Sequence, residues 1–250
     1  LGLDKLPSKS NLYRSLDRFD TPERVEELAD VNKTVLDHLV GNEHLAILDI
    51  DTTVNTVHGE QEGASVGYNP RYRGRRSYQP LVAFEGHSGA AVYAQLRMGT
   101  SPTAEEKVDF YRQAKAQLPP GVKLGFVRAD KAFASDTFFC ALEEDGVHYA
   151  IKLRMTSGLQ EGILRGVLWK RLSGGPDEII ECGSVNFKAD GWSRYRRVVI
   201  IRRRPVFELQ EKLFEEYAWE YEPIATTGSW AAAPAKPILG ISNTAYILMQ

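Results

Sequence analysis

Residues 45–54 have the sequence LAILDIDTTV, in which a short apolar run leads directly into two aspartates. A run of this length and composition predicts a fully buried strand. Side chains alternate along a strand, so Asp49 and Asp51 are expected on the same face. Two carboxylates at the end of a buried strand are costly unless a cation neutralises them. The stretch therefore predicts a site for a divalent cation. The alternative is one aspartate that caps a turn beside another that pairs with an arginine.

The composition is that of a folded protein without a membrane span. The chain has 250 residues, of which 43% are hydrophobic, enough for one large domain or one domain with an elaboration. The formal net charge of −2 excludes a uniformly basic nucleic-acid binder but allows a local basic surface. Cys140 and Cys182 match no metal-ligand spacing, and we expect both to be reduced in a cytoplasmic protein. No apolar run is long enough to predict a transmembrane helix.

The segments after residue 54 predict an α/β fold. Further strands are expected at 78–84, 91–97, 122–127 and 147–153, and helices at 103–117 and 135–145. This order predicts a mixed sheet, an antiparallel meander followed by parallel strands, flanked by helices. Asp130 follows the fourth strand as Asp51 follows the first. If these strands are adjacent and parallel, both carboxylates lie at the same edge of the sheet.

Four segments of the chain differ in character. Residues 1–44 predict an N-terminal helical segment, and residues 45–153 contain the α/β core. Residues 154–225 lose the alternation of strands and helices and predict a β-rich insertion. Residues 226–250 are rich in alanine and proline and contain no acidic residue, so we interpret them as an atypical tail.

A basic, aromatic stretch follows the acidic strand. Arginine forks suit phosphate groups, and tyrosine rings stack on bases or bond to phosphate oxygens. Because the backbone of a nucleic-acid substrate would run beside the acidic strand, we expect DNA contact rather than a solvated surface loop. A second basic cluster lies on a later strand, where alternation leaves some members merely solvated. The predicted DNA-binding residues are Arg71, Tyr72, Arg73, Arg75, Arg76, Arg194, Arg196 and Arg197.

Several blocks occur in a fixed order, namely LDIDTTV, HGEQEGASVGYNPRYRGRRSYQPLVAF, LRMGTS, VRADKAF, GVHYAIKL and GWSRYRRVVIIRRR. Together they make residues 45–225 resemble bacterial insertion-sequence transposases of the DDE class, which share the ribonuclease-H-like fold of retroviral integrases. The resemblance implies a ribonuclease-H-like mixed sheet with a β-rich insertion. It also implies cleavage of transposon-end DNA and strand transfer to target DNA. We expect a homodimer with DNA, located in the cytoplasm at the nucleoid.

By motif, the resemblance assigns Asp51 and Asp130 as catalytic acids and as ligands of two Mg²⁺ ions, with Mn²⁺ as the alternative ion. Asp49 is a further candidate ligand. One ion would activate the attacking oxygen and the other would stabilise the leaving oxygen. The family carries its third acid in a Tyr-x-x-Arg-x-x-x-Glu pattern, which does not occur after residue 225. No third acid is found. We expect a frameshift or premature stop near Thr226, and an impaired enzyme.

Two other functions are consistent with parts of the sequence. The run DIDTTV also fits the motif of haloacid-dehalogenase-type phosphatases, in which Asp49 would be the nucleophile and Asp51 the acid or base. The arginine-rich loop and the antiparallel strands after the motif fit that class poorly. The remaining alternative is a truncated transposase that binds DNA without cutting it.

Overall fold

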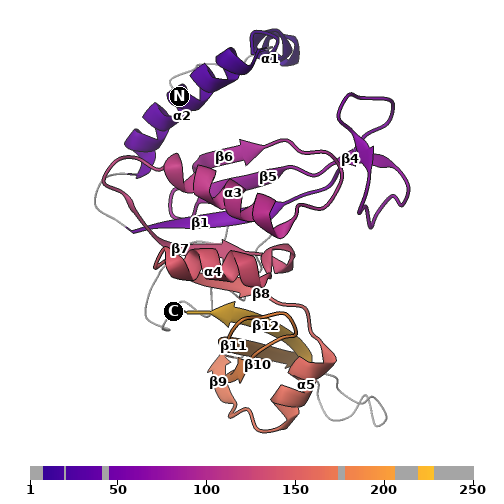
Figure 1. The fold of residues 1–250 in the computed structure, drawn as a ribbon, viewed down its shortest axis with the longest axis vertical. Coiled ribbons are helices and arrows are strands. Elements are labelled where there is room, and N and C mark those ends of the chain that lie inside the picture. Colours follow the sequence, from indigo (N-terminus) through magenta and orange to yellow (C-terminus); the bar gives the residue numbers. More distant parts are fainter. Residues whose placement is uncertain (1–7, 20, 41–44, 174–177, 206–218, 228–250) are drawn as a thin grey trace.

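The computed structural model describes residues 8–19, 21–40, 45–173, 178–205 and 219–227. Within them, one nine-stranded sheet runs through the molecule (Figure 1). Its strands, in spatial order, are β6 (Ala91–Gln95), β5 (Leu81–Glu85), β1 (Leu45–Thr52), β7 (Lys123–Ala129), β8 (His148–Lys152), β12 (Glu220–Thr226), β11 (Arg196–Pro205), β10 (Glu178–Phe187) and β9 (Lys170–Ser173).

The first five strands in this order form the predicted core. β1 pairs antiparallel with β5, which pairs antiparallel with β6. On its other side β1 pairs parallel with β7, and β7 pairs parallel with β8. The predicted ribonuclease-H-like mixed sheet, a meander followed by parallel strands, is therefore confirmed.

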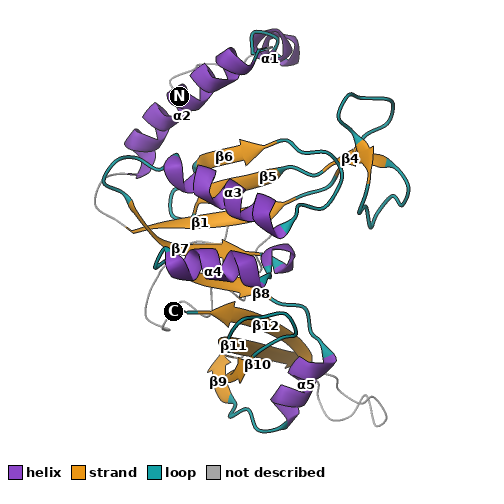
Figure 2. Cartoon of the chain, in the orientation of Figure 1, coloured by secondary structure: helices purple, strands orange, loops and turns teal. Residues whose placement is uncertain are grey.

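Two helices, α3 (Ala104–Ala116) and α4 (Asp136–Glu144), cover one face of this core (Figure 2). The predicted capping box begins α3, because the Glu106 N–H donates to Thr103 Oγ1 at 3.2 Å and the Thr103 N–H donates to Glu106 Oε2 at 2.7 Å. Ser135 caps α4 through the N–H of Phe138, at 3.3 Å. The side chains of these capping residues therefore fix the positions at which the two helices begin.

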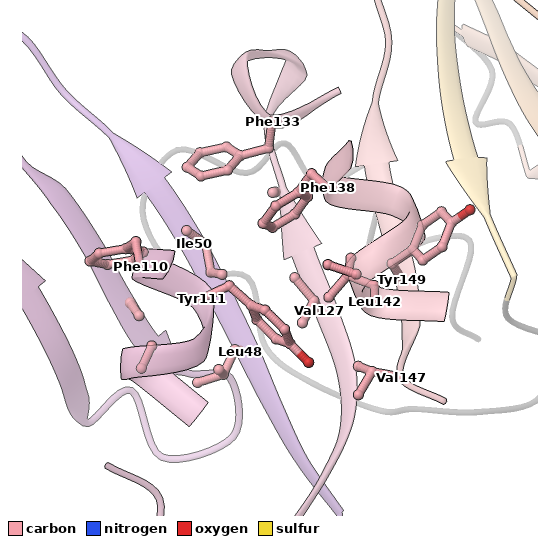
Figure 3. Packing of buried hydrophobic residues seen from close by; sticks show 14 of the residues in the cluster. Leu48, Ile50, Phe110, Tyr111, Val127, Phe133, Phe138, Leu142, Val147 and Tyr149 are labelled. Carbon is pink, nitrogen blue, oxygen red and sulfur yellow. The ribbon is translucent and has the colours of Figure 1, made fainter. Parts of the chain in front are cut away.

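The alternation of β1 divides its side chains between two layers. Leu48 and Ile50 point into the core beneath α3 and α4, where they pack with Tyr111 and other buried residues (Figure 3). Ile47 belongs to a separate apolar cluster that includes Ile224. Because the period of a strand is two, Asp49 and Asp51 lie on the side of Ile47, away from the α3–α4 core.

The predicted β-rich insertion continues the core sheet. β12 pairs antiparallel with β8, and β11, β10 and β9 follow in antiparallel order. A short helix, α5 (Ser157–Leu164), packs Leu159 into a cluster with Val198 and Ile200. The sequence did not predict α5 or β9, which have eight and four residues and lie among mixed charges that hide their periodicity.

Two parts extend beyond the sheet (Figure 1). At one end are α1 (Lys9–Leu16) and α2 (Pro22–Val40), and α2 is attached through the Asn32 amide, which donates to Ala91 O at 3.0 Å. Beyond the carboxyl end of β1 is a small sheet of β2 (Asn55–Thr56), β4 (Arg76–Tyr78) and β3 (Ser65–Val66). None of the helices in the described ranges is both long and apolar enough to cross a membrane. The tail from residue 228 onward lies outside the described residues.

Candidate active site

Asp51 and Asp130 lie next to each other at the carboxyl ends of β1 and β7. The last registered pair of these parallel strands is Ile50 with Ala129, and the two aspartates follow directly. Burial raises the pKa of Asp51, and the negative charge of Asp130 raises it further, although a hydrogen bond from the Thr52 N–H opposes both effects. The structure thus brings together the two carboxylates that the sequence singled out.

A tight turn holds Asp130 in place. Asp130 caps the 3₁₀ turn η1 (Lys131–Phe133), because its Oδ1 accepts the Ala132 N–H at 2.8 Å. Phe133 anchors the turn in the core against Phe138, with ring centroids 5.5 Å apart (Figure 3). Asp51 Oδ1 similarly accepts its neighbour's N–H, that of Thr52, at 2.8 Å. No described residue donates a hydrogen bond to Oδ2 of either Asp51 or Asp130. Each carboxylate therefore has one oxygen available to a ligand.

Asp49 differs from these two acids because Arg128 forms a hydrogen bond with each of its carboxylate oxygens. The guanidinium donates through Nε to Oδ1 and through Nη2 to Oδ2. The side chains of Arg128 and Asp49 are only 3% and 5% exposed. This pairing removes Asp49 from the candidate metal ligands. It also argues against the phosphatase alternative, which requires a free nucleophile at this position. The sequence allowed an aspartate–arginine pair here but could not identify the arginine.

A pocket beside Asp130 is lined by cationic and polar side chains. The Nζ of Lys107, in α3, donates to Ala132 O at 2.6 Å. Burial lowers the pKa of Lys107, and the negative charge of Asp130 opposes this effect. Lys131 and Arg154 are exposed and form no ion pair within the described residues. The lining residues are Thr52, Val54, Tyr68, Gln79, Ser101, Pro102, Lys107, Asp130, Lys131, Ala132 and Arg154. Lys107 and Arg154 could not be predicted from the sequence, since single cations in a helix and a loop belong to no motif.

The predicted basic loop lies on the surface between β3 and β4. Its members Arg71, Tyr72, Arg73, Arg75 and Arg76 are all exposed. In the described part of the chain, none of the four arginines pairs with a carboxylate; the Nη1 of Arg75 lies 3.5 Å from His58 Nδ1. Tyr68, three residues before the loop, lines the pocket beside Asp130. Tyr68 therefore links the pocket to the segment that leads into the loop.

A close backbone contact attaches the small sheet that carries this loop. A Cβ atom on Gly67 would lie 2.0 Å from the carbonyl oxygen of Gly99, and one on Gly99 would lie 2.4 Å from Ser77 O. Side chains other than hydrogen cannot occupy these positions without moving the backbone. The two glycines thus hold the small sheet against the segment that leads to the pocket residues Ser101 and Pro102.

The second basic cluster divides into surface and interior residues. Arg194 is exposed, and Arg197 is half-buried. Arg196 is buried on the side facing α4, where its Nε donates to Glu143 Oε1 at 2.7 Å and its Nη1 donates to Asp136 Oδ1 at 2.6 Å. Two carboxylates therefore occupy the guanidinium, and we remove Arg196 from the candidate DNA-binding set. The sequence predicted that the arginine side chains of this strand would alternate between its two faces. Only the tertiary structure shows that Arg196 is the one that faces inward.

The Arg196 cluster also shifts the acidity of its partners. Burial would raise the pKa values of Asp136 and Glu143, but the hydrogen bonds and charge of Arg196 and other nearby donors outweigh it. The pKa values of both carboxyl groups therefore lie below their ordinary values. Both groups are charged at neutral pH, which keeps β11 joined to α4.

Among the described residues, no group of three or more histidine, cysteine, aspartate or glutamate side chains could together hold a metal ion. Asp51 and Asp130 supply two carboxylates. The segment expected to carry a third acid in related enzymes falls outside the described residues. The described part of the site is therefore a pair of acids beside a cationic pocket.

Comparison with sequence models of protein families shows the family to which the chain belongs. The sequence model of the family described as "Transposase DDE domain group 1" matches residues 3–214. The chain belongs to this family of DDE transposases. The resemblance to DDE-class transposases is confirmed, and the comparison does not favour the phosphatase alternative. DDE transposases as a family use divalent metal ions, in agreement with the two adjacent carboxylates of this member.

Two solved structures are similar to this DDE transposase. The piggyBac transposase synaptic complex with hairpin DNA gives a TM-score of 0.45 at 10% identity, and the similarity covers 90% of this chain and 42% of that chain. Endonuclease V of Ciona intestinalis, in complex with an inosine-containing DNA, gives 0.28 at 9% identity, covering 82% of each chain. No curated protein matches the sequence. The family membership therefore rests on the sequence match.

Proposed function

We propose that this transposase belongs to a bacterial insertion sequence and acts on transposon-end DNA through Asp51 and Asp130. The observation that carries the proposal is the meeting of these two carboxylates, each with one oxygen free, beside a cationic pocket. Carboxylate oxygens are the ligands that Mg²⁺ prefers. Asp51 and Asp130 would hold Mg²⁺, or Mn²⁺ in its place. Two such ions, when bound, supply activation of an attacking oxygen and stabilisation of a leaving oxygen in phosphoryl transfer.

The cationic side chains around the acids would orient the DNA. Lys107, Lys131 and Arg154 can contact phosphate oxygens in the pocket. The exposed arginines of the 71–76 loop, with Tyr72, would extend this contact along the strand, and Arg194 and Arg197 remain candidates further away. These contacts position the backbone and carry no base sequence. We further propose that the chain works as a homodimer on DNA, at the nucleoid.

The metal site can be tested without requiring catalysis, by titrating the chain with Mn²⁺ and following free Mn²⁺ by electron paramagnetic resonance. We expect Asp51→Asn and Asp130→Asn each to weaken binding at least about tenfold, because each change removes one anionic ligand. Asp109→Asn alters an exposed carboxylate on α3 and is the matched control, for which unchanged affinity is expected. Equal Mn²⁺ affinity in all four proteins would show that Asp51 and Asp130 do not hold the ion.

DNA contact can be tested by measuring the affinity for double-stranded DNA over a series of salt concentrations. Replacing Arg71, Arg73 and Arg76 by alanine should lower the slope of log affinity against log salt by about 0.9 for each lost phosphate contact. Alanine at the exposed Arg14, Arg18 and Arg165 is the matched control. An unchanged slope would exclude the loop from the DNA interface. Salt-sensitive binding without Mg²⁺-dependent nicking would favour the non-cutting alternative.

A further inference from the structure

We propose that the buried Asp49–Arg128 pair positions the two acids, by setting the register of β1 and β7 that brings Asp51 and Asp130 together. The inference rests on the proposed function, because that function gives the two acids a shared task. Asp49 and Arg128 are positioning residues. Each lies two residues before one of the acids, and its effect passes through the strand.

The strands β1 and β7 contain two registers that differ by one residue. Near the start, Leu45 pairs with Lys123; after an irregularity at Ala46 and Ile47, the offset has grown by one residue, so that Asp49 pairs with Arg128. If the first register continued to the end, Asp51 would pair with Ala129. The carboxylates of Asp51 and Asp130 would then point to opposite faces of the sheet, because a slip of one residue exchanges the faces.

The ion pair can form only in the second register. Asp49 and Arg128 lie directly opposite each other, and the guanidinium meets the carboxylate through two parallel hydrogen bonds. A slip of one residue would turn the Arg128 side chain toward Leu48 and Ile50, into the apolar core. Both charges are buried, so a register that separates them leaves each without a partner. The pair therefore penalises the wrong register.

The turn after β5 confines the arginine from a second direction. The Gly86 N–H donates to Ile47 O at 2.8 Å, and a Cβ atom on Gly86 would lie 3.0 Å from Arg128 Nη2. The buried Glu85 accepts the backbone N–H of Ser88 at 2.7 Å and that of Ile47 at 3.4 Å. Glu85 thus ties the turn to β1, and the turn leaves Arg128 no room on that side.

Stability alone does not account for this arrangement. A buried ion pair is often no more stabilising than a well-packed apolar pair of similar volume, whereas it can select one alignment over another. Here the pair lies directly before the two acids, on the segment where the register has just changed. A device that selects alignment is needed at that place if Asp51 and Asp130 are to act together.

Cross-linking can measure the alignment directly. Cysteines are introduced at both acids, Asp51→Cys and Asp130→Cys, and treated with a short thiol-specific cross-linker; the 51–130 product is identified by peptide mass spectrometry, which separates it from products of the native thiols. When the two-cysteine protein also carries Asp49→Leu and Arg128→Met, we expect the yield of the 51–130 cross-link to fall at least about fivefold while the protein stays folded. The reason is that the ion pair no longer favours one register of β1 and β7 over the other. The charge-reversed pair Asp49→Arg with Arg128→Asp should recover most of the yield.

A matched control changes another cross-strand ion pair, Glu181→Leu with Arg202→Met on β10 and β11, whose atoms Oε2 and Nη2 lie 2.5 Å apart. The yield of the 51–130 cross-link in this control should equal that in the protein that carries the two cysteines alone. Parent-level yield in the folded apolar variant at positions 49 and 128 would overturn the proposal. If that variant does not fold, Arg128→Lys decides: a yield at least twofold lower supports the proposal, and an unchanged yield overturns it. Cross-linking needs neither metal nor DNA, so its outcome is independent of the Mn²⁺ and DNA experiments.

Discussion

Replacing Arg196 by methionine is expected to lower the free energy of unfolding by about 3 kcal/mol. The arginine is buried, pairs with Glu143 and Asp136, and lies over the rings of Phe139 and Trp192, with distances of 4.9 and 5.4 Å from the guanidinium carbon to the ring centroids. Methionine fills much of the volume but removes the buried guanidinium that pairs with both Asp136 and Glu143. We place the loss at the lower end of the range for broken buried pairs because the Asp136 side chain is 24% exposed. Urea unfolding at neutral pH measures it.

The control for this prediction is Arg194→Met. Arg194 lies 3.5 Å from the same Glu143, but its side chain is 58% exposed, so the change should cost less than about 1 kcal/mol. The pH dependence gives a second check. Because the pKa values of Asp136 and Glu143 are lowered in the folded protein, the pairing stabilises fully above their ordinary values and is lost as the pH falls through the lowered ones. The difference between parent and Arg196→Met should therefore shrink in acid. A difference that stays constant would contradict this account.

Replacing Phe133 by alanine is expected to cost about 3–5 kcal/mol of stability. Its side chain is fully buried and packs against Phe138, and the centroid of its ring lies 6.0 Å from the Nζ of Lys107. Phe133 also ends the turn that Asp130 begins, so the cavity would loosen the position of that carboxylate. We therefore expect weaker Mn²⁺ binding as well as lower stability. Urea unfolding and Mn²⁺ titration, both under conditions where the variant is folded, measure the two effects.

The matched control is Phe110→Ala in α3. Phe110 is equally buried, and its ring lies 5.3 Å from that of Tyr93, far along the chain from either acid. This variant should lose comparable stability but keep the parent's Mn²⁺ affinity. If both variants lose affinity to the same degree, the effect of Phe133→Ala is general loosening and does not depend on the turn that holds Asp130.

Much of the core could be predicted because its strands and helices carry local signals. The apolar run from Leu45 to Ile50 required a buried strand, and Thr103 with Glu106 set the start of α3 through a capping box. The small sheet could not be predicted, since β2 and β3 have two residues each and form through close backbone contacts. Elements of that length have no periodicity to detect.

The sequence by itself determined the family, the mixed α/β order and the two acids at the carboxyl ends of parallel strands, since motif spacing and apolar periodicity are local properties of the chain. Only the tertiary structure decided how similar residues divide between roles. Asp49 is paired whereas Asp51 is open, and Arg196 is buried whereas the arginines near Gly74 are exposed. Register and packing between distant strands set these differences. A side chain's partner depends on which strand lies opposite, and residue type alone does not record that.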